Sequence, residues 1–256
     1  MMKKTFGCCV AIFLLTCASA AWGAETREQT YVVGADVNTQ GQVTQTQVDA
    51  NVNKGIASFL DLALKRWQFV PAHHDGNAAI VHTFIEIKFE VIPGDADKYT
   101  LRVSYLKHGP KWDSRPPKYP AQAIRERDTG MVVLLGRMNQ DGEFEISETR
   151  AILANGNPRS TLKQAARNWL ASLHAVPETV NGQPVAADTR VAINFRLNEV
   201  VTGRGLSSAH TAYSKKEQQL LLDSGFKPPF SRDGFDTHLV SSVLQTRIIN
   251  PVTMHL

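Results

Sequence analysis

The residue types best suited to metal or acid–base chemistry lie together at His73, His74 and Asp75. Histidine nitrogens and carboxylates bind zinc, and a histidine beside an acid also serves as a general base. Adjacent histidines rarely converge on one ion, and no further His or Cys at ligand spacing completes a metal site. We therefore expect no metal and no cofactor. An exported hydrolase that uses His73 or His74 is the alternative that this cluster supports.

Sequence motifs of the common catalytic classes are absent. The sequence has no Gly-x-Ser-x-Gly elbow, Walker loop, zincin helix or glycine-rich dinucleotide loop. Its three cysteines, Cys8, Cys9 and Cys17, all lie near the N-terminus, so a thiol nucleophile is excluded from the rest of the chain. The sequence favours a protein that is not an enzyme.

The N-terminus has the pattern of a secretory signal, with Lys3-Lys4, an apolar run over 6–15 and Ala18-Ser19-Ala20. We interpret residues 1–24 as a signal peptide, which predicts a periplasmic protein without disulfides. In the alternative interpretation, residues 6–22 are retained as an inner-membrane anchor, because about 17 apolar residues is the lower limit for crossing a bilayer.

Length and charge exclude further classes of protein. About 230 residues follow the signal, which is enough for two small domains that each bury a core. Without Lys3 and Lys4, the 28 basic residues become 26, against 24 acidic ones. This balance indicates neither a nucleic-acid binder nor a polybasic membrane patch.

A repeated spacing dominates the remaining sequence. Pro71, Gly76 and Phe89 recur, each 106 positions later, as Pro177, Gly182 and Phe195. The turns at 38–41 and 139–142 correspond at an offset of 101, and we attribute the difference of five to a longer loop and helix in the second copy. The chain is interpreted as two copies of one module.

The periodicity predicts the same elements in both modules. The first module has a hairpin turning at Gly41, an amphipathic helix whose apolar face extends from Ile56 to Trp67, and a strand over 80–92. The second has strands over 131–138 and 144–153, a helix from Asn157 onward, and an alternating last strand. The predicted fold class is α+β, with two small antiparallel sheets that each carry one or two helices on one face.

The predicted boundaries are 25–107 for the first module, 108–118 for a linker and 119–198 for the second module. A tail over 199–256 fits neither copy. In the tail, Ser214 and Glu217 form a capping-box pattern, and Gly225 marks the predicted helix end. The tail has no motif that assigns it a role.

The second module has an ordered series of a Tyr-Pro-x-x-Ala turn, an Asp-Gly turn, a Pro after a helix, an Asn-Gly turn and a final Phe. Its members are Tyr119, Pro120, Ala123, Gly130, Asp141, Gly142, Pro177, Asn181, Gly182 and Phe195. Over about 80 residues this series resembles the C-terminal domain of the TonB energy-transducer family. The first module is similar to a degenerate copy, because it lacks the Tyr-Pro turn.

The resemblance implies a binding site at the last strand, which in this family accepts an extended receptor peptide by strand addition. The corresponding partner-binding residues are Tyr119, Pro120, Thr189, Arg190, Val191, Ala192, Ile193, Asn194 and Phe195. In the simpler interpretation, the tail or the first module covers this edge, and Tyr119-Pro120 is ordinary packing.

The resemblance further implies a periplasmic protein that acts through protein–protein contacts with an envelope protein or receptor peptide. Nucleic acid is not an expected partner. The alternative is a membrane-anchored energy transducer for outer-membrane transport that retains residues 6–22. The apolar segment has no histidine and no long Pro-rich spacer follows it, whereas the transducers carry both.

Overall fold

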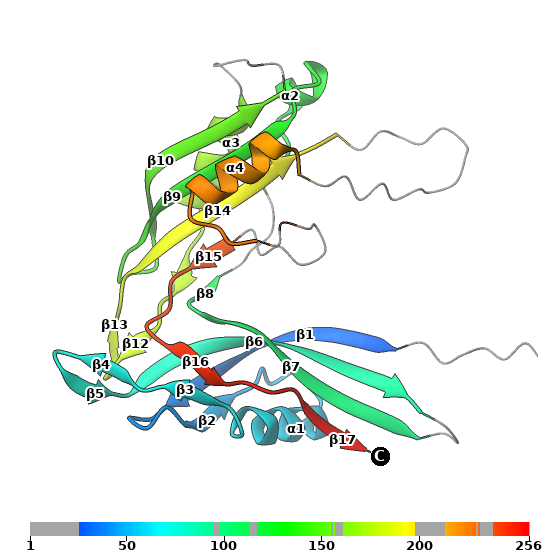
Figure 1. Cartoon of the computed structure of the whole chain (residues 1–256), viewed down its shortest axis with the longest axis vertical. Helices are drawn as coiled ribbons and strands as arrows, with labels where there is room; N and C mark the ends of the chain where they lie inside the picture. The colour runs from blue at the N-terminus through cyan, green and yellow to red at the C-terminus, as the bar shows by residue number, and fades with distance from the viewer. Residues whose placement is uncertain are drawn as a thin grey trace, which may run out of the picture.

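The structure is a computed structural model, and it describes residues 26–94, 98–112, 117–154, 156, 161–197, 213–228, 230 and 238–255. The predicted signal peptide lies outside the described residues. The fold is α+β and strand-rich, with two larger antiparallel sheets in the described part of the chain (Figure 1). The first sheet has the strand order β13-β12-β6-β1-β2, with β7 and β17 continuing beside β6, and the second has the order β10-β9-β14-β15.

The first sheet is built on the predicted hairpin of β1 (Arg27–Val37) and β2 (Val43–Gln47). β6 (Val81–Pro93) pairs with the whole of β1, and β7 (Tyr99–Gly109) pairs with β6. Apolar side chains alternate along β6 because every second residue faces the core. The hairpin and the long strand are therefore confirmed, and β7 adds a further strand beside β6.

Helix α1 (Lys54–Leu64) packs Phe59, Leu60, Ala63 and Leu64 into this core. The Asn53 side chain caps it by accepting a hydrogen bond from the Gly55 amide at 2.8 Å. The expectation that the helix extends to Trp67 is wrong. Trp67 lies in the closing turn, buried, and its indole donates to the Asn250 carbonyl at 2.8 Å.

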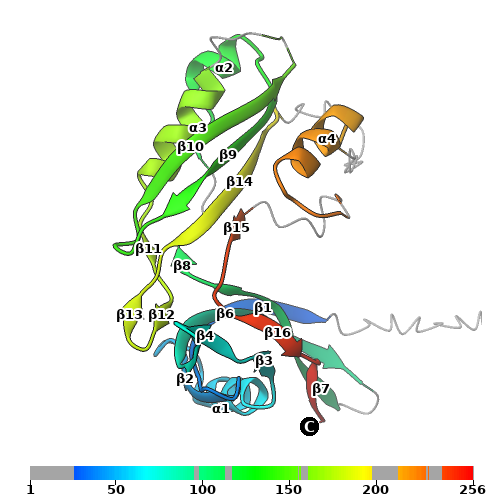
Figure 2. The same ribbon diagram turned by 60° about the vertical axis from the view of Figure 1, so that its left-hand side comes forward.

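The second sheet has helices on both faces (Figure 2). α3 packs Leu162, Ala166 and Leu170 on one face. α4 packs Leu221 on the other face, against Val133 and its neighbours. The elements are α2 (Ala121–Arg125), β9 (Gly130–Met138), β10 (Phe144–Leu153), α3 (Thr161–Ala171), β14 (Ala187–Phe195) and α4 (Lys215–Asp223).

The two copies differ in a strand that the sequence did not predict to be longer, and the predicted start of the second helix at Asn157 lies outside the described residues. β10 has ten residues and β2 has five, whereas α1 and α3 both have 11 described residues. The offset changes from 101 to 106 between two equivalent bridges, Gln42 with Gln68 and Glu143 with His174. The insertion thus lengthens the β9–β10 hairpin.

Short strands connect the two sheets. β12 (Thr179–Val180) and β13 (Gln183–Pro184) form a hairpin whose first strand pairs with β6 of the first sheet. β8 (Lys111–Trp112) pairs with β11 (Ala175–Val176), so part of the expected linker is strand. β4 (Ala72–His74) and β5 (Asn77–Ala79) form a separate hairpin.

The C-terminal residues 238–255, here called the strap, contact both sheets. β15 (His238–Val240) pairs with β14, β16 (Gln245–Ile248) with β3 (Gln68–Val70), and β17 (Val252–His255) with β7. The tail was expected to fit neither module. Instead it adds a strand to each sheet.

Glu178 lies where the first sheet, the second half of the chain and the strap meet. Its side chain is 1% exposed, and its carboxylate accepts from Thr83 Oγ1 at 2.5 Å, Ser242 Oγ at 2.7 Å and the Val243 amide at 3.1 Å. His108 Nε2 lies 3.2 Å from the Leu244 carbonyl, and burial lowers the pKa of His108. This cluster fixes the strap against β6.

Replacing Glu178 with alanine should destabilise the protein by about 3 kcal/mol, because it leaves buried donors without their charged acceptor. Urea unfolding measures the loss. Glu145→Ala, on the exposed side of β10, is the matched control and should change stability by less than about 0.5 kcal/mol. Equal losses in the two variants would contradict the role assigned to Glu178.

Glu90 makes stability depend on acid pH. Hydrogen bonds from Arg102 at 2.7 and 2.9 Å, together with Lys88, lower the pKa of Glu90 from 4.5 to about 2. Because the folded-state pKa is depressed, its stabilisation is complete above pH 4.5 and is lost as the pH falls to about 2. Glu90→Gln should flatten that part of the stability profile, measured by urea unfolding at each pH. The same change at half-buried Glu86 should leave the slope in place.

Candidate functional site

Tyr119 and Pro120 pack α2 against the end of β14. The Tyr119 ring meets Phe195 edge to face with centroids 5.5 Å apart, and its hydroxyl donates to the Asp128 carbonyl. Burial and the nearby Asp128 charge raise the pKa of Tyr119. Pro120 is the N-cap residue of α2. Tyr119 therefore packs against β14, and Pro120 begins the helix.

The two faces of β14 contact different helices. Val191, Ile193 and Phe195 belong to the hydrophobic cluster beneath α3, whereas Ala192 belongs to the cluster beneath α4. Arg190 and Asn194 alternate with the first set and share the α4 face with Ala192. The predicted site residues from 189 to 195 are thus one continuous strand with apolar surroundings on both faces.

One edge of β14 is paired along its whole length, and the other edge is paired along part of it. β9 pairs with the full strand from Ala187 to Phe195. On the opposite edge, β15 pairs with Thr189, Arg190 and Val191. No strand within the described ranges pairs with residues 192–195 on that edge. Within the described residues, the strap therefore pairs with the first part of the predicted site, Thr189 to Val191.

Backbone groups in the uncovered part point away from β9. The Ser241 amide donates to the Asp188 carbonyl at 2.9 Å, and the Asp188 amide donates to Ser241 Oγ at 2.9 Å. Because hydrogen-bonding direction alternates along an antiparallel strand, Arg190, Ala192 and Asn194 direct their amides and carbonyls to this same side. Ala192 and Asn194 therefore direct two amides and two carbonyls to the edge away from β9.

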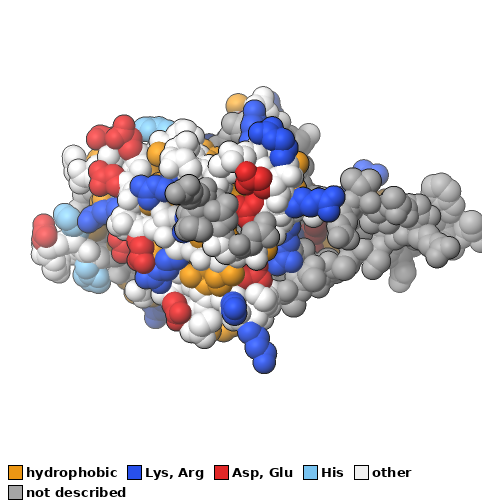
Figure 3. Space-filling model, turned by 90° about the horizontal axis from the view of Figure 1, so that it is seen from above, with side chains coloured by type: hydrophobic (Ala, Val, Ile, Leu, Met, Phe, Trp, Pro, Cys, Tyr) orange, Lys and Arg blue, Asp and Glu red, His pale blue; other side chains and the backbone are white. Residues whose placement is uncertain are grey.

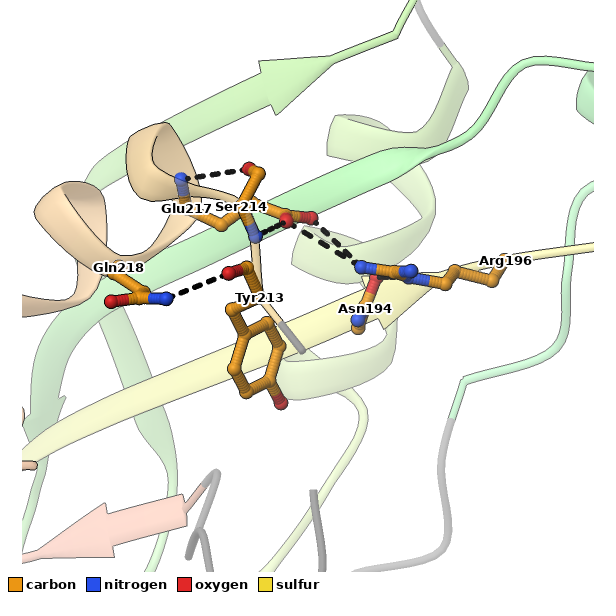
Figure 4. A network of polar contacts seen from close by, with 6 residues as sticks. All are labelled: Asn194, Arg196, Tyr213, Ser214, Glu217 and Gln218. Atoms are coloured by element: carbon orange, nitrogen blue, oxygen red, sulfur yellow. Dashed lines mark hydrogen bonds and ion pairs between the residues drawn. The ribbon is translucent and has the colours of Figure 1, made fainter. Parts of the chain in front are cut away.

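A polar network closes the end of this edge (Figure 4). Arg196 donates to Asn194 Oδ1 at 3.1 Å and to Glu217 at 3.3 Å, and Glu217 also accepts from the Ser214 amide at 2.7 Å. Ser214 Oγ in turn accepts from the Glu217 amide, which completes the predicted capping box. Gly225, with φ +82°, follows the helix end as expected. A cavity of about 350 Å³ beside this network is lined in part by Gly130, Asn194 and Arg196.

The residues of the histidine cluster lie on an exposed hairpin. His73 and His74 are exposed on β4, and His74 Nε2 lies 3.5 Å from Asp75 Oδ2. Among the described residues, no three His, Cys, Asp or Glu side chains gather in a metal-binding arrangement. The acid–base pair that the structure brings closest is instead His82 and Asp36, 2.6 Å apart on β6 and β1, which sequence spacing did not indicate.

Surface charge and hydropathy add two observations. On the face seen in Figure 3, acidic and basic side chains are interspersed. No helix in the described part of the chain is long and apolar enough to span a membrane. The apolar residues 6–22 lie outside the described residues.

The sequence that contains α2, β9, β10, α3 and β14 matches a known domain family. Residues 115–197 match the family described as Gram-negative bacterial TonB protein C-terminal. This segment is a match to the TonB C-terminal domain. It confirms the resemblance for the second module, while the match does not reach the first.

Two curated relatives agree with this match. Both are named Protein TonB, from Xanthomonas campestris pv. campestris strains B100 and ATCC 33913, and each is 34% identical over 83 residues. The aligned part is 32% of this chain and 35% of each relative. The chain therefore spans about a third of the length of these TonB proteins.

The strap and the packing face of α4 are the features of the site that sequence reasoning missed. β15 has three residues, too few for a periodic pattern. The capping box indicated α4, but nothing in the sequence indicated the sheet face on which it packs. Arg196 lies one residue beyond β14 and pairs with Glu217. A search for basic partners of Glu217 in the sequence could have placed α4 near the end of β14.

Replacing Glu217 with alanine should release α4 from the sheet, because one carboxylate supplies both the capping bond and the ion pair to Arg196. We expect a loss of about 1 to 2 kcal/mol and faster amide exchange in α4 than in α3. Lys216→Ala, exposed on the same helix, should leave exchange unchanged. Equal exchange in both variants would contradict this attachment.

Proposed function

We propose that this chain is an exported periplasmic protein that acts through protein–protein contacts and not by catalysis. Its β14 edge binds an extended segment of an envelope protein by strand addition. The observation that carries the proposal is the stretch of β14 beyond β15, where Ala192 and Asn194 direct backbone groups to an edge without a described strand. The TonB-like sequence of residues 115–197 supports it.

The edge has the two properties that strand addition needs. Backbone donors and acceptors of β14 provide affinity for a partner strand. The side chains around its two faces provide specificity for the partner's side chains. Here one face offers the cluster of Val191, Ile193 and Phe195, and the other offers Ala192 with Leu221. An added strand would therefore bury apolar side chains on both sides of its backbone.

We further propose that the chain consists of two tandem modules. The hairpin turns agree contact for contact: Asn38 Oδ1 accepts from the amides of residues 40 and 42, and Asn139 Oδ1 from those of 141 and 143, all at 2.9 to 3.0 Å. The Gly41 and Gly142 carbonyls both accept at 2.8 Å, from the Phe69 and Ala175 amides. Strand order supports the duplication too, as β2-β1-β6 corresponds to β10-β9-β14.

The proposed tandem arrangement supports the assignment of binding to the second module. In the first, β6 corresponds to β14, and its edge away from β1 is paired with β12 at residues 81–82 and with β7 at 84–93. In the second module, β15 covers only three residues of the corresponding edge. Binding by strand addition is therefore assigned to the copy with the uncovered edge.

A second candidate is a membrane-anchored energy transducer that retains residues 6–22. The two relatives named Protein TonB favour it. N-terminal sequencing of the protein recovered from cell envelopes separates the candidates. A chain that begins near residue 21 to 25 contradicts the anchor, and a chain that retains residues 6–22 contradicts release into the periplasm.

A photo-crosslinking amino acid at position 194 should capture a defined envelope protein in Gram-negative cells, since an added strand would lie beside it. The same amino acid at position 145, on the outer strand β10, is the matched control. Ala192→Pro removes one edge donor without breaking a β9 bond, and should abolish the product. Identical products from both positions, or a product that survives Ala192→Pro, would contradict the proposed edge.

A further inference from the structure

The strap occupies part of the edge that the proposed function assigns to a partner. Beyond β15, residues 192–195 of β14 pair with no described strand on this edge, and Ala192 and Asn194 direct their backbone groups toward it. A strand of ordinary length has about five or six residues. Laid antiparallel along β14 from Phe195, such a strand reaches Val191 or Arg190, where β15 is already paired. A partner of ordinary length and β15 therefore exclude each other.

β15 is the weakly held part of the strap. It pairs with β14 through three residues. Beyond it, Ser242 and Val243 bind Glu178, the Asn250 carbonyl accepts from Trp67, and β16 and β17 pair with the first sheet. Residues 242–255 have independent attachments, so β15 can leave β14 while the rest of the strap stays in place.

We infer that β15 is a displaceable strand that closes the β14 edge until a partner strand of similar chemistry replaces it. The inference rests on the proposed function and specifies which residue types the partner strand carries on each face. Val240, opposite Thr189, packs on the cluster beneath α3, so the partner has apolar residues at alternate positions on that face. On the other face, Arg190 lies under Gly225, and its positive charge favours an acidic or polar residue opposite it.

An opened variant tests the displacement. Leu239 is opposite Arg190 at a hydrogen-bonding position, so Leu239→Pro removes a ladder bond. His238→Pro, at the neighbouring non-hydrogen-bonding position, is the matched control. The probe is a fluorescent synthetic peptide that copies residues 234–242. Leu239→Pro should bind the probe at least about 10-fold more tightly than the unchanged chain, because the tethered β15 no longer competes, and His238→Pro should bind it like the unchanged chain.

A locked variant tests the same point in the opposite direction. Thr189 and Val240 form a non-hydrogen-bonded pair, whose Cα atoms lie about 4.5 Å apart, within disulfide range. We pair Thr189→Cys with Val240→Cys in a chain whose Cys8, Cys9 and Cys17 are serine. The reduced protein should bind the probe weakly, and the oxidised protein should lose that binding. Reduction should restore it, which shows that the fold is intact.

Amide exchange at Arg190 reports whether β15 is still paired with β14 in each variant, and it is measured together with probe binding. Faster exchange and tighter probe binding in Leu239→Pro support the inference. If the oxidised and reduced locked proteins bind the probe equally well, β15 does not close the edge; the inference is overturned and strand addition stands. If Leu239→Pro speeds exchange at Arg190 but binds no probe, the edge accepts no strand, and the inference and the proposed strand addition both fail.

Discussion

The arrangement of the chain depends on one buried carboxylate. Glu178 is placed between two short strands of the second half, yet its three described hydrogen bonds go to β6 and to the strap. A buried acid must be satisfied by such donors, because removal from water is costly for a charged group. The position of Glu178 therefore constrains the path of the strap past β6. It also places β12 beside the first sheet.

From this anchor the strap runs along the edges of three strands: β14, β3 and β7. Exposed edges invite pairing with other chains, and proteins commonly cover them. β17 covers part of β7, β16 pairs with β3, and β15 covers part of β14. At β14 the described pairing comprises three residues, from Thr189 to Val191. One C-terminal segment thus adds strands to both sheets.

Local signals in the sequence predicted local structure well. The Asn-x-x-Gly turns, the alternation along β6 and β14 and the Ser214–Glu217 capping box each depend on neighbouring residues, and the structure confirms them. The helix ending before Trp67 was missed because its indole is held by Asn250, 183 residues away. The strap was missed for the same reason: its three- and four-residue strands are stabilised by distant partners and have no period of their own.

The pairing of β17 with β7 determines when the first sheet can be completed during synthesis. The two strands are separated by more than 140 residues, from Gly109 to Val252, and contacts of such long range form late in folding. During synthesis from the N-terminus, the edge of β7 away from β6 cannot pair with β17 until residues 252–255 have been made. The first sheet is therefore completed only after the second half of the chain has been made, and a chain that stops before Val252 would lack the β17 pairing.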